Sequence, residues 1–198
     1  MVTKGRTKIW KVTITAACLL CLLAAGSPRA QSSDSASSEY LIKAGFIYNF
    51  AKLMEWPAPV FAQPNSPIVI AILGTDPFQG TLDNVLRGKQ ANGREFVVKH
   101  LKWGDDLRGC NIIFVSSSEK THFDDLFRQI HGLPILTIGD TPGFAESGGI
   151  INFVLEDDKV RFEIDVDAAR QADINISSRL LALAKIVPDT ASAARRPQ

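Results

Sequence analysis

The chain has 198 residues, of which 45% are hydrophobic and 22% are charged. These fractions are typical of one folded globular domain with short additional segments, and they exclude a disordered chain. Basic and acidic residues nearly balance, with a net charge of +1, and only three cysteines are present. The charge balance excludes a strongly basic nucleic-acid-binding protein, and the cysteine count excludes a disulfide-rich scaffold.

The first 30 residues have the composition of a secretory signal peptide. They contain five basic residues and no acidic one, and a short apolar run covers residues 12–25. The run is shorter than the ~20 residues that cross a bilayer, and small residues follow it. We expect cleavage after Gly26 or after Ala30 and export to the periplasm, with an uncleaved membrane anchor as the alternative.

The expected mature chain is mildly acidic. Removal of residues 1–30 changes the net charge from +1 to −4. Such a chain has no evident attraction to nucleic acid or to anionic lipid, so we expect neither nucleic-acid binding nor direct membrane insertion after cleavage.

Two segments lack periodic apolar residues. Residues 31–38 are predicted to form a flexible linker, and residues 188–198 a disordered tail. The folded domain is therefore expected over residues 39–187. It begins with an apolar helix predicted over residues 40–56, which carries only a narrow polar stripe and ends before Pro57.

Short apolar runs and helical patterns then alternate along the chain. Strands are predicted over residues 68–73, 96–101, 111–115 and 135–138, and helices over residues 77–87 and 116–130. Asp76 and Pro77 are suited to begin the first of these helices, and Ser116 with Glu119 has the capping-box spacing for the second. This alternation predicts an α/β fold with a mainly parallel sheet.

The C-terminal part of the domain has a different pattern. Strands are predicted over residues 150–155 and 160–164, joined as an antiparallel hairpin, and helices over residues 167–172 and 178–187. In the second strand Arg161, Glu163 and Asp165 alternate with apolar residues, which predicts a face in water. In the last helix, the inner face is expected to consist of Leu180, Leu181, Leu183 and Ala184. The predicted fold class is a single layered α/β domain with helices on both faces.

The residues outside the apolar start contain no H-E-x-x-H, C-x-x-C, G-x-S-x-G or Walker A motif. His100, His122 and His131 do not stand at metal-ligand spacing. We therefore expect no catalytic residue, no metal site and no cofactor. Ser117 and Lys120 match the S-x-x-K pattern of penicillin-recognising enzymes, but its companion motifs are absent. Helix capping explains the serines of residues 116–118 better than catalysis does, and a hydrolase that uses Ser117 and Lys120 is the distant alternative.

Candidate ligand- or partner-binding residues come from the position of the strands. Open α/β sheets bind ligands beyond the carboxyl ends of their strands. The candidates there are Gly74, Thr75, Asp76, Ser116, Ser117 and Asp140. Cys110 is the one cysteine outside the signal peptide, and it precedes a predicted buried strand. We expect it to be a buried, unpaired thiol, with pairing between two chains as the alternative.

Several segments together resemble one protein family. They are residues 40–52 with 55–57, 70–74 with 76–78, 110–116, 136–140 with 148–153, 159–164 and 177–184. In this order they are similar to the YfiR family of small periplasmic proteins, over residues 40–187. Most of the matching residues are apolar or glycine, so the resemblance bears on the fold more than on a site.

The resemblance implies a compact α/β periplasmic domain that often dimerises, and a regulator rather than an enzyme. In the best-known members the protein binds the periplasmic part of an inner-membrane diguanylate cyclase and represses it. Cyclic di-GMP and biofilm formation are then lowered. The alternative is a small-ligand-binding module that serves a sensor kinase or receptor, because fold does not fix function.

This chain departs from the redox-sensitive members of that family. In those members a cysteine of the first strand bonds to the one that matches Cys110, whereas this chain has Ala71 there. A second pair expected near residues 148–149 is also missing. The resemblance therefore implies no disulfide switch within this chain.

Overall fold

A computed structural model of the chain describes residues 30–187. The segments expected as signal peptide and tail lie outside the described residues, apart from Ala30. The chain divides into two compact units after Ala36. Only residues 30–36, the start of one helix, are described in the first unit, and everything below concerns the second.

The described elements follow one another as strands and short helices. The helices are α2 (Ala30–Leu53), η2 (Ala58–Val60), α3 (Thr81–Leu86), η3 (Ser117–His122), α4 (Phe123–Gln129), α5 (Val166–Gln171) and α6 (Ser178–Leu181). The strands are β1 (Met54–Glu55), β2 (Ile68–Leu73), β3 (Gln90–Ala91), β4 (Arg94–Leu101), β5 (Ile112–Val115), β6 (Leu136–Gly139), β7 (Ile151–Glu156), β8 (Lys159–Asp165), β9 (Asn175–Ile176) and β10 (Lys185–Val187).

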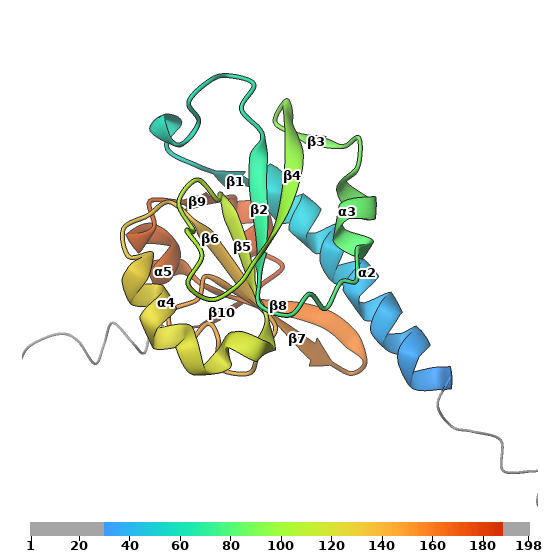
Figure 1. Cartoon of the computed structure of the whole chain (residues 1–198). Coiled ribbons are helices and arrows are strands. Elements are labelled where there is room, and N and C mark those ends of the chain that lie inside the picture. The colour runs from blue at the N-terminus through green and yellow to red at the C-terminus, as the bar shows by residue number, and fades with distance from the viewer. Residues whose placement is uncertain (1–29, 188–198) are drawn as a thin grey trace, which may run out of the picture. The chain divides into compact units, whose positions relative to one another are not determined.

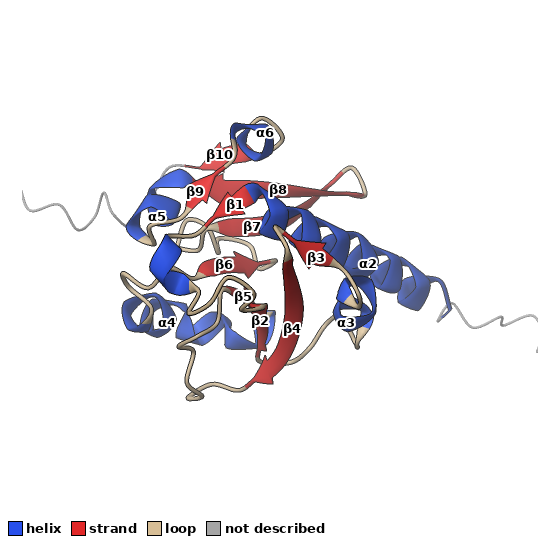
Figure 2. Ribbon diagram, turned by 90° about the horizontal axis from the view of Figure 1, so that it is seen from above, coloured by secondary structure: helices blue, strands red, loops and turns tan. Residues whose placement is uncertain are grey.

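An eight-stranded sheet forms the centre of the domain, in the order β10-β8-β7-β6-β5-β2-β4-β3. β2 pairs in parallel with both β4 and β5, and β6 joins β5 and β7 in parallel as well. β7 and β8 form an antiparallel hairpin. The predicted single α/β domain with a mainly parallel sheet and a C-terminal hairpin is therefore confirmed, and Figure 2 shows these strands from above.

The sheet separates two apolar cores. Ile68, Ile70 and Ile72 of β2 pack on one face with residues of α2 and α3. Ala71 and Leu73 pack on the other face with residues of α4. Figure 1 shows these helices on opposite sides of the strands. Burial on both faces explains why the β2 sequence is a continuous apolar run rather than an alternating one.

α2 differs from its prediction at both ends. It begins at Ala30, so residues 31–38, predicted as a flexible linker, are helical in the structure. No glycine or proline lies between Ala30 and Ala44. A helix nucleated by its buried part can therefore extend through such a segment at little cost. The helix ends at Leu53 rather than at residue 56, because Met54 and Glu55 pair with β9.

The helix predicted over residues 77–87 is shorter in the structure. α3 begins only at Thr81, after Gln79 and Gly80 adopt positive φ angles of 50° and 81°. These left-handed conformations cannot continue a right-handed helix. Asp76 Oδ1 accepts a hydrogen bond from the backbone N of Phe78 at 2.8 Å. Asp76 thus closes a local turn instead of capping a helix.

The helix predicted from Ser116 to residue 130 is present in two parts, η3 and α4. The Ser116 side chain accepts the backbone N–H of Ser118, so its predicted capping role is confirmed. Glu119 does not complete the capping box. Its carboxylate accepts from Ser118 Oγ at 2.9 Å and lies 3.2 Å from His122 Nδ1. The backbone N of Ser116 donates instead to Leu73 O at 3.0 Å.

The C-terminal prediction is wrong beyond residue 181. α6 ends at Leu181, and Lys185–Val187 form β10, which pairs in parallel with the free edge of β8. Leu183, expected on an inner helix face, is 71% exposed. A strand at this edge satisfies β8 backbone groups that a helix would leave unpaired.

Two acidic residues of β8 expected in water are buried. Glu163 is covered by Lys185, whose Nζ donates to Glu163 Oε1 at 2.8 Å. Asp165 Oδ1 accepts from the backbone N–H groups of Asp167 and Ala168, both at 2.9 Å. It therefore caps α5, an interaction that strand alternation alone does not reveal.

Phe144 anchors the loop between β6 and β7. Its ring is buried against Phe123 and Phe127, at centroid distances of 5.0 and 5.5 Å. A Cβ atom added at Gly139 or Gly149 would lie 2.6 or 2.1 Å from this ring. Both positions therefore need glycine so that the backbone can approach Phe144, and this contact holds residues 140–149 in place.

We predict that Gly149→Ala destabilises the domain by about 1–3 kcal/mol, because the added methyl group overlaps the Phe144 ring. Gly45→Ala is the matched control. Gly45 lies within α2, and nothing lies within 4 Å of an added Cβ there. It should stabilise the domain by up to ~1 kcal/mol through helix propensity. Urea unfolding of both variants measures the two effects, and equal midpoints would contradict the packing argument.

Candidate functional site

The structure brings most of the predicted candidate residues together. The sheet order places β4 and β5 on opposite sides of β2, so the switch point lies between β2 and β5. Gly74, Thr75 and Asp76 follow β2, and Ser116 and Ser117 follow β5. The two segments meet directly, because the backbone N of Thr75 donates to Ser118 Oγ at 3.0 Å.

Protein side chains already occupy this crevice. A Cβ atom at Gly74 would lie 2.4 Å from Ser118 Oγ and 2.5 Å from Glu119 Oε1. Gly74 is therefore required for the approach of η3, and its φ of +93° also suits glycine. Ser116 is buried and caps η3, whereas Ser117 is exposed. The candidates at this edge connect two loops and leave little space for a bound ligand.

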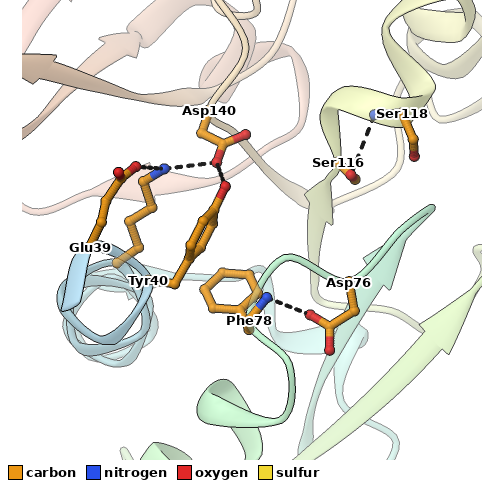
Figure 3. Close-up of polar contacts among 8 residues, drawn as sticks. Glu39, Tyr40, Asp76, Phe78, Ser116, Ser118 and Asp140 are labelled. Carbon is orange, nitrogen blue, oxygen red and sulfur yellow. Dashed lines mark hydrogen bonds and ion pairs between the residues drawn. The ribbon is translucent and has the colours of Figure 1, made fainter. Parts of the chain in front are cut away.

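Aromatic side chains fill the edge next to these loops. Phe78 is 1% exposed and contacts the Phe114 ring edge-to-face at 4.8 Å. Tyr40 of α2 contacts the other side of Phe78 at 5.3 Å, also edge-to-face. Figure 3 shows the Tyr40 ring between Phe78 and Asp140. Asp140 itself follows Gly139, the register partner of Val115, and therefore lies next to Ser116 at the carboxyl ends of β5 and β6.

Asp140 belongs to a second polar group, which joins α2 to the end of β6. Its Oδ2 accepts hydrogen bonds from Tyr40 OH and from Lys43 Nζ, both at 2.8 Å. Lys43 Nζ also lies 2.6 Å from Glu39 Oε1, one helical turn away (Figure 3). Nearly one hundred residues of sequence separate the two sides of this network.

The network is almost completely removed from water. The side chain of Lys43 is 4% exposed and that of Asp140 is 8% exposed. Buried charges of this kind are tolerated only when they are paired and hydrogen-bonded. The Lys43 ammonium group also lies 4.4 Å from the centre of the Tyr40 ring. The position of α2 on the sheet is therefore specified by charge as well as by apolar packing.

A cleft opens beside this network. It has a volume of about 480 Å³, within the range of protein ligand sites. We call it the α2–hairpin cleft, and it is lined by Glu39, Lys43, Asp140, Pro142, Gly143, Glu146, Asn152, Phe153, Val154, Leu155 and Glu163. Of the predicted candidates only Asp140 lies here. The cleft is thus distinct from the carboxyl-end crevice between β2 and β5.

Sequence reasoning missed the other charged residues of the α2–hairpin cleft. Lys43 was a detectable signal, since a lysine within an apolar helix requires a buried partner. Glu163 was assigned to water because it alternates with apolar residues. Asn152 is 1% exposed, and its amide nitrogen, in the orientation that satisfies its neighbours, donates to the carbonyls of Thr141 and Gly139 at 3.2 and 3.3 Å. Its position as the second residue of β7 does not indicate that its side chain is buried or bound to these carbonyls.

Cys110 is a buried free thiol in the described part of the chain. It packs in the same apolar cluster as Ala71. Burial raises the pKa of its thiol, which keeps it protonated and unreactive.

The described residues contain no group of three or more His, Cys, Asp or Glu side chains arranged to hold a metal ion. Within residues 30–187, no helix combines the length and the apolar composition needed to cross a membrane.

Comparison with protein families gives one match. The model of a family described as YfiR/HmsC-like matches residues 40–185. The matched segment begins at Tyr40, in the buried network, and ends at Lys185, in β10. It therefore includes the whole eight-stranded sheet except the last two residues of its edge strand, together with the polar groups described above apart from Glu39.

We predict that Asp140→Ala lowers the free energy of unfolding by about 3 kcal/mol. Removing one partner of a buried ion pair leaves the other charge poorly compensated, and Glu39 offsets part of this cost for Lys43. Asp125→Ala is the control, because Asp125 pairs with Arg128 at an exposed site and should cost less than about 1 kcal/mol. Chemical denaturation measures both, and equal losses would show that the Asp140 network contributes no more than a surface pair.

We also predict a dependence on alkaline pH. Burial, and then the neighbouring Asp140 carboxylate, raise the pKa of the Tyr40 hydroxyl above its usual value. A folded-state pKa above the unfolded-state value gives a stabilising contribution that is complete below pH ~10 and lost as the pH rises above it. Asp140→Asn should lower the pKa of Tyr40, because it removes the negative charge.

The measurement follows the ultraviolet absorbance of tyrosinate during a pH titration. The chain has two tyrosines, so a Tyr48→Phe background leaves Tyr40 as the only one that titrates. If the Tyr40 hydroxyl titrates at the same pH with and without Asp140→Asn, the proposed coupling between Tyr40 and Asp140 is contradicted.

Proposed function

Because this chain belongs to the YfiR/HmsC-like family, we propose that it binds the sensory domain of an inner-membrane diguanylate cyclase and represses it. Proteins of this family are periplasmic regulators of the cyclic di-GMP pathway and are not enzymes. Repression would lower cyclic di-GMP and, with it, biofilm formation. The observation that carries this proposal is the family match over residues 40–185, which covers the folded domain.

The surface of the domain supports a protein-binding role. Several large apolar side chains are more than a third exposed: Leu41, Ile42, Val97, Trp103, Leu155, Leu183 and Ile186. Of these, Leu155 lines the α2–hairpin cleft, and exposed apolar side chains at a cleft are typical of interaction surfaces. The crevice between β2 and β5 is filled by Phe78, Ser118 and Glu119, which favours binding through the surface over binding of a small ligand at that edge.

Repression by binding has an energetic requirement. The regulator can shift its partner only by as much as its affinity differs between the inactive and active states. A shift from nearly all active to nearly all inactive needs a difference of ~10⁴-fold. A rigid domain held by a buried charge network can present one fixed surface, and it can therefore discriminate between two arrangements of a sensory domain.

We predict that a tagged form of this protein, purified from the periplasm, retains an inner-membrane diguanylate cyclase in an affinity pull-down. The pull-down uses detergent-solubilised membranes of its own organism. Mass spectrometry identifies the retained proteins, and untagged protein should compete them off. Deletion of the gene should raise cyclic di-GMP, because repression is lost. Recovery of a sensor kinase or receptor instead would contradict the cyclase assignment, and unchanged cyclic di-GMP under several envelope stresses would contradict repression.

A further inference from the structure

β7 has one unpaired edge beside the α2–hairpin cleft. On one side β7 pairs with β8 along its whole length, from Ile151 to Glu156. On the other side it pairs with β6 only at Ile151 and Asn152, where β6 ends. Among the described residues, no strand therefore pairs with this side of residues 153–156. Phe153, Val154 and Leu155 at this edge also line the α2–hairpin cleft.

An unpaired edge accepts an extended chain. A peptide laid beside β7 would continue the sheet at the point where β6 stops, and its main chain would supply affinity through backbone hydrogen bonds. Adjacent side chains of such a peptide point to opposite faces of the sheet. The lining of the α2–hairpin cleft on the two faces then determines which side chains fit.

The face of the sheet that bears α2 is apolar next to this edge. Phe153 of β7 and Phe162 of β8 contact the Phe46 ring of α2, at centroid distances of 6.1 and 5.5 Å. Leu155 lies two residues outward from Phe153, on the same side of the strand, and is 57% exposed. Ile42 lies one helical turn before Phe46 and is 47% exposed. A partner side chain on this face would therefore meet exposed leucine and isoleucine side chains. Figure 2 shows the β7–β8 hairpin beside α2.

The charged lining of the α2–hairpin cleft is predominantly negative. Glu39, Asp140, Glu146 and Glu163 line it, against the single ammonium group of Lys43. Lys185 reaches Glu163 from β10 and adds a second ammonium group beside this lining. A cationic side chain is the charge complement of this lining.

Two of these carboxylates have an oxygen available. The side chains of Asp140 and Glu163 are each only 8% exposed. Asp140 uses Oδ2 for both of its hydrogen bonds, and Glu163 uses Oε1 for its bond to Lys185. Their second oxygens accept no hydrogen bond from the described residues. A guanidinium or ammonium group in the cleft could donate a charge-assisted hydrogen bond to such an oxygen.

We propose that the α2–hairpin cleft binds an extended segment of the partner protein, in which a basic residue alternates with an apolar one. The segment pairs with the free edge of β7. Its arginine or lysine enters beside Glu163, on the face of the sheet opposite α2, and the adjacent apolar residue packs on Leu155 and Ile42 on the α2 face. This inference rests on the proposed function for the existence of a protein partner, and it adds where and by what chemistry the partner is recognised.

The test uses a pentapeptide of alternating valine and arginine, blocked at both ends. Nuclear magnetic resonance follows the backbone amide signals of the isotope-labelled protein, purified from the periplasm, as the peptide is added. We expect shifts at residues 140–146 and 152–156 that weaken at high salt. The same peptide with glutamate in place of arginine should cause none. Shifts of equal size with both peptides, or none with either at millimolar concentration, would overturn the proposal.

Variants separate the two components of recognition. Glu163→Gln should weaken arginine-peptide binding about tenfold, since one charge-assisted contact is lost. Leu155→Ser should also weaken it, because the apolar contact is removed. Glu95→Gln on β4 and Leu183→Ser, between α6 and β10, are matched controls. They make the same chemical changes at exposed positions that do not line the α2–hairpin cleft, and should leave binding unchanged. Unchanged binding by both cleft variants would overturn the proposal.

The same variants distinguish this proposal from the proposed function. If the unaltered protein retains a membrane partner and the Leu155→Ser, Glu163→Gln double variant retains it equally well, the cleft proposal fails and the regulatory function stands. If the unaltered protein retains no partner while the arginine peptide binds as expected, the regulatory function fails and the assignment of the cleft stands. Unchanged thermal unfolding of each variant ensures that a loss of binding does not come from loss of fold.

Discussion

The ion pair between Lys43 and Asp140 connects the parts of this domain that matter for its surface. It joins the middle of α2 to the residue that follows β6, and it holds Tyr40 against Phe78. Apolar packing alone would allow a helix to shift by small amounts along the sheet, because dispersion contacts are not directional. A hydrogen-bonded charge pair permits one position only, and its burial makes any alternative costly.

The position of α2 then determines which surfaces are open. Tyr40 and Phe78 close the carboxyl-end edge near β2 and β5, where many α/β proteins bind small ligands. The α2–hairpin cleft opens on the other side of the network, between the helix and the end of β6. The same residues thus fill one crevice and line another. For a regulator that acts by binding a protein, a cleft bordered by a free strand edge is the more useful of the two.

The loop between β6 and β7 depends on a separate constraint. Phe144 is inserted between Gly139 and Gly149, so the ends of the loop are held close to the α4 side of the sheet. Asp140 directly follows the first of these glycines, and the loop returns to β7 just after the second. The geometry of the charge network therefore depends on two glycines that belong to neither of its charged groups. Their presence in the sequence marks a close approach and not a flexible segment.

The sequence by itself determined the layered α/β architecture, because buried parallel strands must be continuous apolar runs and their helices must follow in alternation. It also predicted the hairpin, the Ser116 cap and the burial of Cys110, since each depends on a few neighbouring residues. Local pattern failed where a distant partner decided the outcome. Residues 185–187 follow a helical pattern, yet they form a strand because β8 offers an unpaired edge.

The residues of the candidate site show the same difference between what local sequence predicts and what distant partners decide. Glu163 reads as a solvent-facing strand residue, and only the arrival of β10 buries it under Lys185. Lys43 and Asp140 stand nearly a hundred residues apart, and no spacing rule connects them. The sequence determined which residues are charged and which strands exist. The tertiary structure alone decided that these charges meet, because pairing between distant residues depends on how the elements pack and not on their local sequence.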